Sequence, residues 1–338
     1  MQNGVVQVGI LGCGRIARTR HIPELAANPN ACLAGFYNRT LAVAEELASG
    51  LGGRAYATPE ELLADPFLDA VCVLTPNSSH AELAISALRA GKHVLCEKPM
   101  AVSPEECERL AEAERASTNI LMIAQNQRFH AAHVKAQKLI ASGAIGNVLT
   151  VQASFSHGGP SMDANSWFLS KSTGRLGVLG DLGVHKIDLV RFLTGQEIVA
   201  IGAVVDTLDK KSKDGGRIEL DDNTACLFRL SGGAIGTLTV SWTAYGKPDV
   251  STRICGTLGT IELMRTFEEP LVLYRPGAEP EQIAVESTAN SGVIDAFIGA
   301  IVSGAPSPVS AASVLPSMRA LFAAYESGRT GGNMIRLD

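Results

Sequence analysis

The chain has 338 residues, 46% of them hydrophobic, so it is too long for one compact core and favours two domains. Its formal net charge of -5 and the lack of any lysine- and arginine-rich run argue against a nucleic-acid partner. The amino terminus lacks the basic start of a signal peptide, and no stretch approaches the roughly 20 apolar residues of a membrane span, so we expect a cytoplasmic protein without a membrane partner.

Seven cysteines are spread along the chain without closely spaced pairs. An odd number of cysteines at such spacings does not fit a disulfide framework. The paired cysteines of a structural zinc site are also missing. The sequence therefore predicts neither disulfides nor a bound metal.

From residue 5 to residue 125, short apolar runs alternate with helical patterns. The runs are VVQVGIL, CLAGFY, DAVCVL, HVLCE and ILMIAQ, and a helical pattern follows each of the first four. This alternation predicts parallel strands joined by crossover helices, that is, a doubly wound Rossmann sheet in a domain over residues 1–125. Capping boxes that begin at Thr58 and Ser103 mark two of the helix starts.

Beyond residue 126 the rhythm changes to longer runs with strand-like alternation. These runs are NVLTVQASFS, EIVAIGAVVD, TACLFRL, AIGTLTVSW and GTIELM. Turn residues at 231–233 and 256–259 predict hairpins, so we expect the runs to pair antiparallel in one large sheet. Residues 126–338 are therefore predicted as an α+β domain with a large, mainly antiparallel, open-faced sheet.

Three helical patterns accompany this predicted sheet. One lies in VLGDLGVHKIDLVRFLTG, and the other two lie near residues 292–303 and 311–327. An open sheet has a face that must be covered, and association with further copies of the chain covers it. We therefore expect a homodimer or homotetramer that forms through this sheet.

A glycine pattern follows the first strand directly. In GILGCGRIA, Gly12, Gly14 and Ala17 form G-x-G-x-x-A at the start of the first helix. The first glycine permits the tight turn, the second lets the backbone approach a pyrophosphate, and the alanine allows close helix packing. An isolated match is often a turn without a ligand, but the strand before it and the helix after it favour a dinucleotide site here.

The end of the second strand bears on which cofactor binds. An acid at this place would hydrogen-bond the free ribose hydroxyls of NAD, but the sequence has Asn38 and Arg39 in FYNRT. The carboxylate that would repel a 2′-phosphate is absent, and a guanidinium is present to bind one. The pattern therefore favours NADP(H) over NAD(H), and NAD(H) stays open because Asn38 can still bond a hydroxyl.

Polar residues follow two neighbouring strands of the predicted parallel sheet. TPNSSH, residues 75–80, comes after DAVCVL, and Glu97, Lys98 and Pro99 come after HVLC. Open α/β sheets bind ligands at the carboxyl ends of their strands. Most lysines are solvated surface residues, but one fixed between a strand end and a proline at this edge is a candidate catalytic group.

Asp181 and His185 lie four residues apart in GDLGVHKID, so on a helix they share one face. Taken alone, they are an acid stabilised by the helix dipole and a half-buried histidine. Oxidation of an alcohol by hydride removal, however, needs a base for the hydroxyl proton, and histidine has a suitable pKa. Asp181 would orient the imidazole, and Lys98 would stabilise the oxygen as charge develops.

These residues and motifs resemble the glucose-fructose oxidoreductase and inositol dehydrogenase family, often written Gfo/Idh/MocA. The resemblance covers nearly the whole chain and rests on GILGCGRIA, TPNSSH, AGKHVLCEKP, NQRF, SGAIGNV and GDLGVHKIDLVRFLTG. It implies a Rossmann domain followed by an open-faced α/β domain that builds dimers or tetramers. It also implies a sugar, sugar derivative or cyclitol as substrate and gives Lys98, Asp181 and His185 catalytic roles.

The resemblance also extends the expected site. It implies that Pro99 is often preceded by a cis peptide bond, and that Trp167 lines the substrate cleft. The expected cofactor-binding residues are Gly12, Gly14, Arg15, Ile16, Asn38, Arg39, Thr75, Pro76, Asn77, His80, Glu97, Lys98, Pro99 and Gln127. The expected substrate-binding residues are Lys98, Arg128, Trp167, Asp181 and His185. A departure from the family is GRLGVLGD, which replaces a run of glycines and brings Arg175 near the expected cleft, so the size and charge of the substrate stay open.

The predicted function is NAD(P)-dependent interconversion of a secondary alcohol and a ketone on a sugar, sugar derivative or cyclitol. Two alternatives on the same fold are a non-catalytic cofactor-bound sugar sensor or co-regulator and an NAD-dependent glycosidase. A sensor has no need for a matched acid-base group, so the intact set of Lys98, Asp181 and His185 favours an enzyme. A glycosidase would return its cofactor unchanged, and only an assay separates it from a dehydrogenase.

Overall fold

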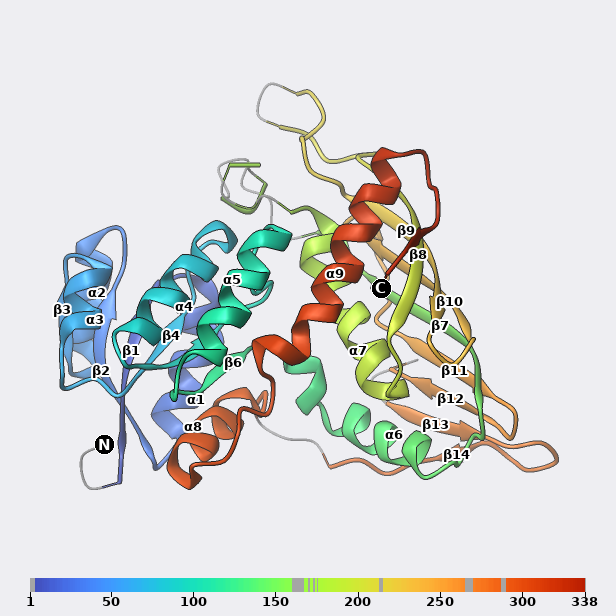
Figure 1. The fold of residues 1–338 in the computed structure, drawn as a ribbon, viewed down its shortest axis with the longest axis horizontal. Helices are drawn as coiled ribbons and strands as arrows, with labels where there is room; N and C mark the ends of the chain where they lie inside the picture. Colours follow the sequence, from blue (N-terminus) through green and yellow to red (C-terminus); the bar gives the residue numbers. More distant parts are fainter. Residues whose placement is uncertain are drawn as a thin grey trace. The chain divides into compact units, whose positions relative to one another are not determined.

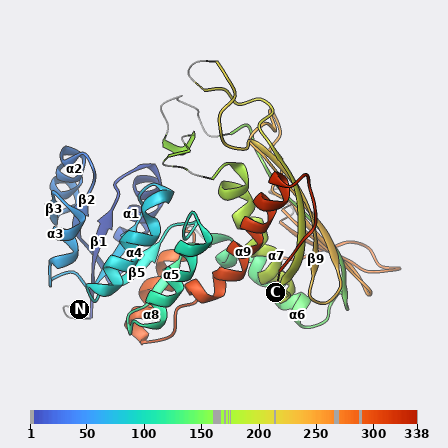
Figure 2. The same ribbon diagram turned by 45° about the horizontal axis from the view of Figure 1, so that its top comes forward.

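The computed structural model describes residues 4–159, 167–169, 171–172, 174, 176–212, 215–264, 270–286 and 290–337. The chain forms two compact units, which Figures 1 and 2 show as ribbons. The first consists of Met1–Asn126 and Ala289–Leu315, and the second of Gln127–Thr288 and Pro316–Asp338. No helix within the described ranges is long and apolar enough to cross a membrane.

The first unit is built on a parallel sheet of six strands, and the strand order is β3-β2-β1-β4-β5-β6. This is the order of a doubly wound dinucleotide-binding sheet, so the predicted Rossmann fold is confirmed. Strands β1, β4 and β5 are buried almost throughout, as expected for a sheet with helices on both faces. The strands are β1 Val6–Leu11, β2 Ala31–Tyr37, β3 Arg54–Tyr56, β4 Ala70–Val73, β5 His93–Cys96 and β6 Leu121–Ile123.

Helices connect these strands, and the two predicted capping boxes are present. Thr58 Oγ1 accepts a hydrogen bond from Glu61 N at 3.1 Å, and Ser103 Oγ accepts one from Glu106 N at 3.2 Å. The first helix begins with a π-helical segment, η1 Ala17–His21. The others are α1 Ile22–Ala27, α2 Leu41–Leu51, α3 Pro59–Ala64, α4 His80–Arg89 and α5 Pro104–Arg115, with the 3₁₀ turn η2 Asn77–Ser79 before α4.

A segment close to the carboxyl terminus completes the first unit, whereas the sequence placed all of residues 126–338 in one domain. Helix α8, Val293–Ser303, contacts β1, and Ser291 just before it donates to both oxygens of Glu24 at 2.8 and 2.7 Å. Glu114 accepts hydrogen bonds from the amides of Ala311 and Ala312, the first two residues of α9, Ala311–Arg329. These long-range contacts leave no local pattern in the sequence.

The second unit contains a nine-stranded sheet with the order β14-β13-β12-β11-β7-β10-β9-β8-β15. The predicted hairpins are present, because β9 pairs with β10 and β11 with β12 in antiparallel fashion. One expectation needs correction: β7 and β10 run parallel, with Ile235 opposite Thr150. The strands are β7 Val148–Ser156, β8 Ile198–Asp206, β9 Asn223–Leu230, β10 Ile235–Ser241, β11 Thr252–Gly256, β12 Thr260–Leu263, β13 Leu271–Tyr274, β14 Glu281–Gln282 and β15 Ile335–Arg336.

One face of this sheet is covered by helices. Helices α6 Ala131–Ala141 and α7 Val184–Thr194 lie on it together with the later part of α9 Ala311–Arg329 (Figure 2). On the opposite face, β9 and β10 present every second side chain to solvent, including Leu227, which is 50% exposed, and Ile235, which is 46% exposed. The predicted open-faced sheet is therefore confirmed.

Helix α7 is almost entirely buried although it carries charged side chains. Lys186 is 1% exposed, and its Nζ donates to Val250 O and Thr252 Oγ1, both at 2.8 Å, so it ties the helix to the start of β11. Burial lowers the pKa of Lys186 to about 7, while Asp249 acts in the opposite direction. The lysine is therefore an internal anchor and not a surface charge.

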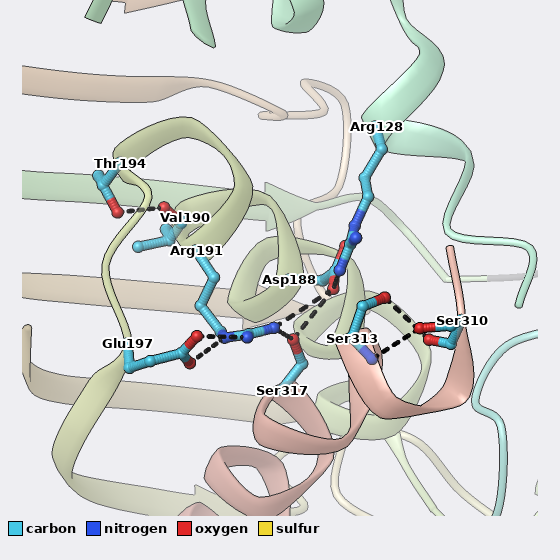
Figure 3. Close-up of polar contacts among 9 residues, drawn as sticks. All are labelled: Arg128, Asp188, Val190, Arg191, Thr194, Glu197, Ser310, Ser313 and Ser317. Carbon is cyan, nitrogen blue, oxygen red and sulfur yellow. Dashed lines mark hydrogen bonds and ion pairs between the residues drawn. The ribbon is translucent and has the colours of Figure 1, made fainter. Parts of the chain in front are cut away.

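A second anchor of α7 is the ion pair between Asp188 and Arg128 (Figure 3). Asp188 is 0% exposed, and Arg128, in the 3₁₀ turn η3 Asn126–Phe129, binds it through two nitrogens at 2.7 and 2.6 Å. Ser317 of α9 donates to the same carboxylate at 3.0 Å and accepts from Arg191 at 2.6 Å. The guanidinium of Arg191 also binds Glu197. The network fixes α7 to η3 and to α9.

Loss of the Asp188 charge should destabilise the second unit strongly. In Asp188→Asn the guanidinium of Arg128 stays buried without its counter-charge, which typically costs about 3–5 kcal/mol. Urea denaturation of the two proteins measures the change in the free energy of unfolding. The matched control is Glu326→Gln, which removes an exposed ion pair with Arg329 and should cost less than about 1 kcal/mol. Equal losses in the two variants would contradict this assignment.

Candidate active site

The glycine turn after β1 has the geometry that its pattern predicts. Gly12 has φ +99°, and a Cβ there would lie 2.8 Å from Leu74 O, so no other residue fits. Around Gly14, by contrast, a Cβ would meet no described atom within 4 Å. The turn is thus tight on its inner side and open beside the start of the following helix, as a bound pyrophosphate requires.

Asn38 joins the end of β2 to this turn. Its Oδ1 accepts a hydrogen bond from Cys13 N at 3.3 Å, and its Nδ2 donates to Thr40 O at 3.2 Å. Arg39 is exposed and makes no ion pair with any residue that the structure describes. The end of β2 therefore carries an amide and an exposed guanidinium, and we expect the adenosine ribose of a dinucleotide to bind there.

His80 connects the loops that follow β4 and β5. Its ring is buried, with Nδ1 2.8 Å from Pro99 O and Nε2 2.8 Å from Thr75 O. Burial lowers the pKa of His80, and hydrogen bonding to the two carbonyls opposes that shift. The peptide bond between Lys98 and Pro99 is cis, in agreement with the resemblance. His80 thus holds the loop at Glu97 to Pro99, which we expect to lie next to the nicotinamide, to the loop that begins at Thr75.

Glu97 fixes the backbone next to Lys98. Its Oε1 lies 2.8 Å from Nε2 of the buried His21, and its Oε2 accepts a hydrogen bond from Lys98 N at 3.0 Å. Burial alone would raise the pKa of Glu97, but the hydrogen bond with His21 and the charge of Lys98 hold it at about 2. The side chain of Lys98 is half-buried. An ionised carboxylate therefore holds the main chain that carries the candidate catalytic lysine.

Gln125, just beyond β6, is a buried residue that sequence reasoning missed. It is 0% exposed, and neither its Oε1 nor its Nε2 has a hydrogen-bond partner among the described residues. A buried amide with both groups unsatisfied is costly unless something else bonds to it. Together with the glycine turn, this unsatisfied amide is compatible with a nicotinamide dinucleotide at the carboxyl edge of the sheet, because the carboxamide of nicotinamide can bond to such an amide.

In the second unit, Asp181 lies in a π-helical turn, η5 Leu179–Gly183, directly before α7. Its Oδ2 accepts a hydrogen bond from Nε1 of the buried Trp242 at 3.3 Å. A Cβ on Gly180 would lie 2.2 Å from Leu176 Cβ, which explains the glycine before Asp181. Isolated π turns within helices are rare and frequently occur at functional sites.

His185 follows this turn on α7 and is 8% exposed. Its ring centroid lies 5.9 Å from that of Phe155, which in turn lies 6.1 Å from the ring of His157. Burial lowers the pKa of the half-buried His157, and the charge of Asp181 opposes that shift. The ends of β7 and β10 and the π turn thus bring a carboxylate, two imidazoles and an indole together in one part of this unit.

The other expected site residues differ in how far the structure describes them. The guanidinium of Arg128 binds Asp188, so the structure gives it a role in anchoring α7, and its contact with substrate stays a prediction. The main-chain oxygen of Gln127 accepts from His133 Nδ1 at 2.8 Å. The side chain of Trp167 and the whole of Arg175 lie outside the described part of the chain. Within the described ranges, no three His, Cys, Asp or Glu side chains could hold a metal ion together.

His21 and Trp242 are the clearest omissions of sequence reasoning. His21 is 0% exposed and contacts Glu97 from 76 residues away, and Trp242 contacts Asp181 from 61 residues away. The only signal for Trp242 is its place at the end of a strand, in SW, which is also a common place for a core residue. Neither contact follows from local spacing.

Two family models match the chain. The one described as "Oxidoreductase family, NAD-binding Rossmann fold" matches residues 6–125, and the one described as "GFO/IDH/MocA C-terminal domain" matches residues 133–262. Together they span most of both units.

Characterised proteins are similar to the chain over different shares of their length. Levoglucosan dehydrogenase of Pseudarthrobacter phenanthrenivorans is 34% identical over 59% of the chain and only 56% of the relative. The dTDP-3,4-didehydro-2,6-dideoxy-alpha-D-glucose 3-reductase of Streptomyces violaceoruber is 30% identical over 88% of the chain and 85% of the relative. Myo-inositol 2-dehydrogenase of Thermotoga maritima is 29% identical over 79% of the chain and 78% of the relative. A solved structure of levoglucosan dehydrogenase with NADH and levoglucosan is 27% identical, covers 98% of this chain and 99% of that chain, and has a TM-score of 0.87.

Proposed function

Because the chain belongs to the Gfo/Idh/MocA oxidoreductase family, we propose that it interconverts a secondary alcohol and a ketone on a sugar, sugar derivative or cyclitol, with a nicotinamide dinucleotide as cofactor. The observation that supports the proposal is that Asp181, bonded to Trp242, and His185 lie together around the π turn of the second unit, while the main chain of Lys98 is held by Glu97 at the end of β5 in the first unit. The relatives named above act on molecules of this class. We also expect the protein to act in the cytoplasm.

The cofactor would be held by the first unit. The amides at the glycine turn and the helix that follows it would bind the pyrophosphate, and Asn38 and Arg39 would meet the adenosine ribose. Gln125 and the loop at Glu97 to Pro99 would surround the nicotinamide. The nicotinamide supplies hydride acceptance from a carbinol carbon or hydride donation to a ketone.

The chain's own residues would manage the proton and the oxygen. His185 takes the hydroxyl proton during oxidation and returns it during reduction, because neutral imidazole is a base near neutral pH. Asp181, itself held by Trp242 Nε1, orients the imidazole. The ammonium of Lys98 stabilises the negative charge that develops on the substrate oxygen.

The two alternatives predict different observations. A sensor would bind cofactor and sugar without turnover, and a glycosidase would release an aglycone without a net change at the nicotinamide absorbance band. A panel that includes levoglucosan, myo-inositol, aldoses and ketoses, assayed with NAD and NADP, separates these alternatives from the proposed dehydrogenase.

Replacing Lys98 should abolish most activity without preventing cofactor binding. Lys98→Met removes the ammonium, and groups of this kind contribute roughly 10²- to 10⁴-fold to the rate. Steady-state kinetics on the best substrate of the panel and quenching of protein fluorescence by cofactor measure the two effects. Lys138→Met, on the exposed side of α6, is the control and should keep full activity. A near-normal rate in Lys98→Met would refute the catalytic role.

The preference between NADP(H) and NAD(H) depends on Arg39. The family description and the relative with bound NADH point to NAD(H), while the exposed guanidinium next to Asn38 favours NADP(H). If Arg39 binds a 2′-phosphate, Arg39→Ala should lower kcat/KM for NADP about tenfold or more and leave that for NAD nearly unchanged, since a charged hydrogen bond contributes about 1.5–3 kcal/mol. Equal effects on both cofactors, or a strong NAD preference in the unmodified protein, would end the NADP(H) hypothesis.

The open face of the nine-stranded sheet supports self-association as a homodimer or homotetramer. It exposes Val204, Leu227 and Ile235. A lysine on such a face would have to be buried in the interface, so Leu227→Lys should shift the mass measured by light scattering towards the monomer. Leu51→Lys, on α2 of the first unit, is the control and should leave the mass unchanged. A monomeric unmodified protein would contradict the proposal.

A further inference from the structure

The π turn that carries Asp181 is held by side chains that lie far away in the sequence. No side chain of the turn's own N-terminal residues caps its backbone amides. Asp221, before β9, and Tyr325, on α9, accept hydrogen bonds from these amides instead. The two residues also bind each other, because Tyr325 OH donates to Asp221 Oδ1 at 3.0 Å.

Asp221 is 7% exposed and holds the turn through both its side chain and its backbone. Its Oδ2 accepts from Leu179 N at 2.9 Å and from Thr224 Oγ1 at 3.0 Å. Its main-chain oxygen accepts from Val178 N at 2.8 Å. Burial raises the pKa of Asp221, and these hydrogen bonds oppose that shift. The carboxylate is thus a built-in acceptor for the first amides of the turn.

Tyr325 supplies the remaining acceptor. Its hydroxyl oxygen accepts from Gly177 N at 3.1 Å and from Gly180 N at 3.2 Å. Since backbone amides only donate, the phenolic proton is left for Asp221. A Cβ on Gly177 would lie 2.1 Å from Asp221 Oδ1, so a glycine is needed for the two segments to approach so closely. Gly177 and Gly180 of GRLGVLGD are explained by this contact and by the packing of Gly180 against Leu176.

The residue after Asp221 holds the partner of the catalytic carboxylate. The main-chain oxygen of Asp222 accepts from Trp242 N at 2.8 Å, and the indole of Trp242 donates to Asp181 Oδ2. Asp221 therefore holds the backbone that carries Asp181, and Asp222 holds Trp242, whose indole bonds to the side chain of Asp181.

We propose that Asp221 and Tyr325 are positioning residues that keep the π turn from relaxing to an α-helix and thereby aim Asp181 at His185. The inference rests on the proposed function, in which these two residues form the acid-base pair. A π turn closes its hydrogen bond one residue later than an α-helix does and so advances by a smaller angle per residue, and relaxation to an α-helix would therefore rotate Asp181 about the helix axis relative to His185. Misplacement of a catalytic group by even 1 Å can cost about 100-fold in rate.

The first test is a double-mutant cycle between Tyr325 and Asp181. Tyr325→Phe should lower kcat about 10- to 100-fold, and it should cause no further loss in an Asp181→Asn background, because its effect passes through Asp181. A loss that is the same in both backgrounds would overturn the positioning role. Tyr274→Phe, which removes a hydroxyl bonded to Glu262 on β12, is the matched control and should keep kcat within about threefold.

The second test does not depend on turnover. Hydrogen exchange followed by mass spectrometry should show faster exchange in peptides that cover residues 177–184 of Tyr325→Phe, and unchanged exchange there in Tyr274→Phe. Unchanged exchange in both variants would refute the proposal. If Tyr325→Phe does not fold, Asp221→Asn replaces it in both tests, since it keeps an oxygen for Leu179 N but loses the charge.

The outcomes separate this inference from the proposed function. Full activity of Asp181→Asn would contradict the catalytic assignment itself. An inactive Asp181→Asn together with a fully active Tyr325→Phe would leave the catalytic assignment standing and reject only the positioning role.

Discussion

The structure depends above all on the need to satisfy charge inside α7, a helix that is buried on nearly every side. Lys186 and Asp188 are almost completely buried, so each must find partners within the protein. The lysine finds them at the start of β11, and the aspartate finds them on η3 and α9. Since these partners lie in different directions, they leave the helix little freedom to turn or slide. The position of His185, directly before Lys186 on the same helix, is therefore fixed as well.

In the first unit, the candidate catalytic residue is held in place in a different way. It lies on a loop, and loops are held by bonds to their backbone. Glu97 bonds to the amide of Lys98, and His80 approaches the carbonyl of Pro99, so the residues on each side of the lysine are held while its side chain stays half-buried. In both units one neighbour of the group proposed to react, Glu97 beside Lys98 and Lys186 beside His185, has a side chain that is hydrogen-bonded within the unit. These neighbours thereby fix the main chain that carries the residues proposed to react.

Local sequence patterns correctly predicted the features that depend on residues close together in the chain. The strand and helix alternation, the capping boxes at Thr58 and Ser103 and the turn at Gly12 were all found as expected, because each depends on a few consecutive residues. The parallel pairing of β7 with β10 and the return of α8 to the first unit were not predicted. Tyr325 meets Gly177 across 148 residues, and no period or spacing encodes such a choice of partner. The choice of partner depends on how the folded elements pack against one another, and this packing cannot be deduced from a single sequence.

The division of the chain into units bears on the order in which the protein can be made. The chain leaves the first unit after Asn126, returns to it at Ala289 and leaves it again after Leu315. The Rossmann sheet emerges early from the ribosome, but α8, which contacts β1, is synthesised only after strands β7 to β14 of the large sheet. Domains generally fold as units in the order of synthesis, but here the first unit cannot be completed until Gln127–Thr288, the larger part of the second unit, has been synthesised. During translation, the surface of β1 that α8 covers therefore stays without α8 until more than half of the polypeptide has been synthesised.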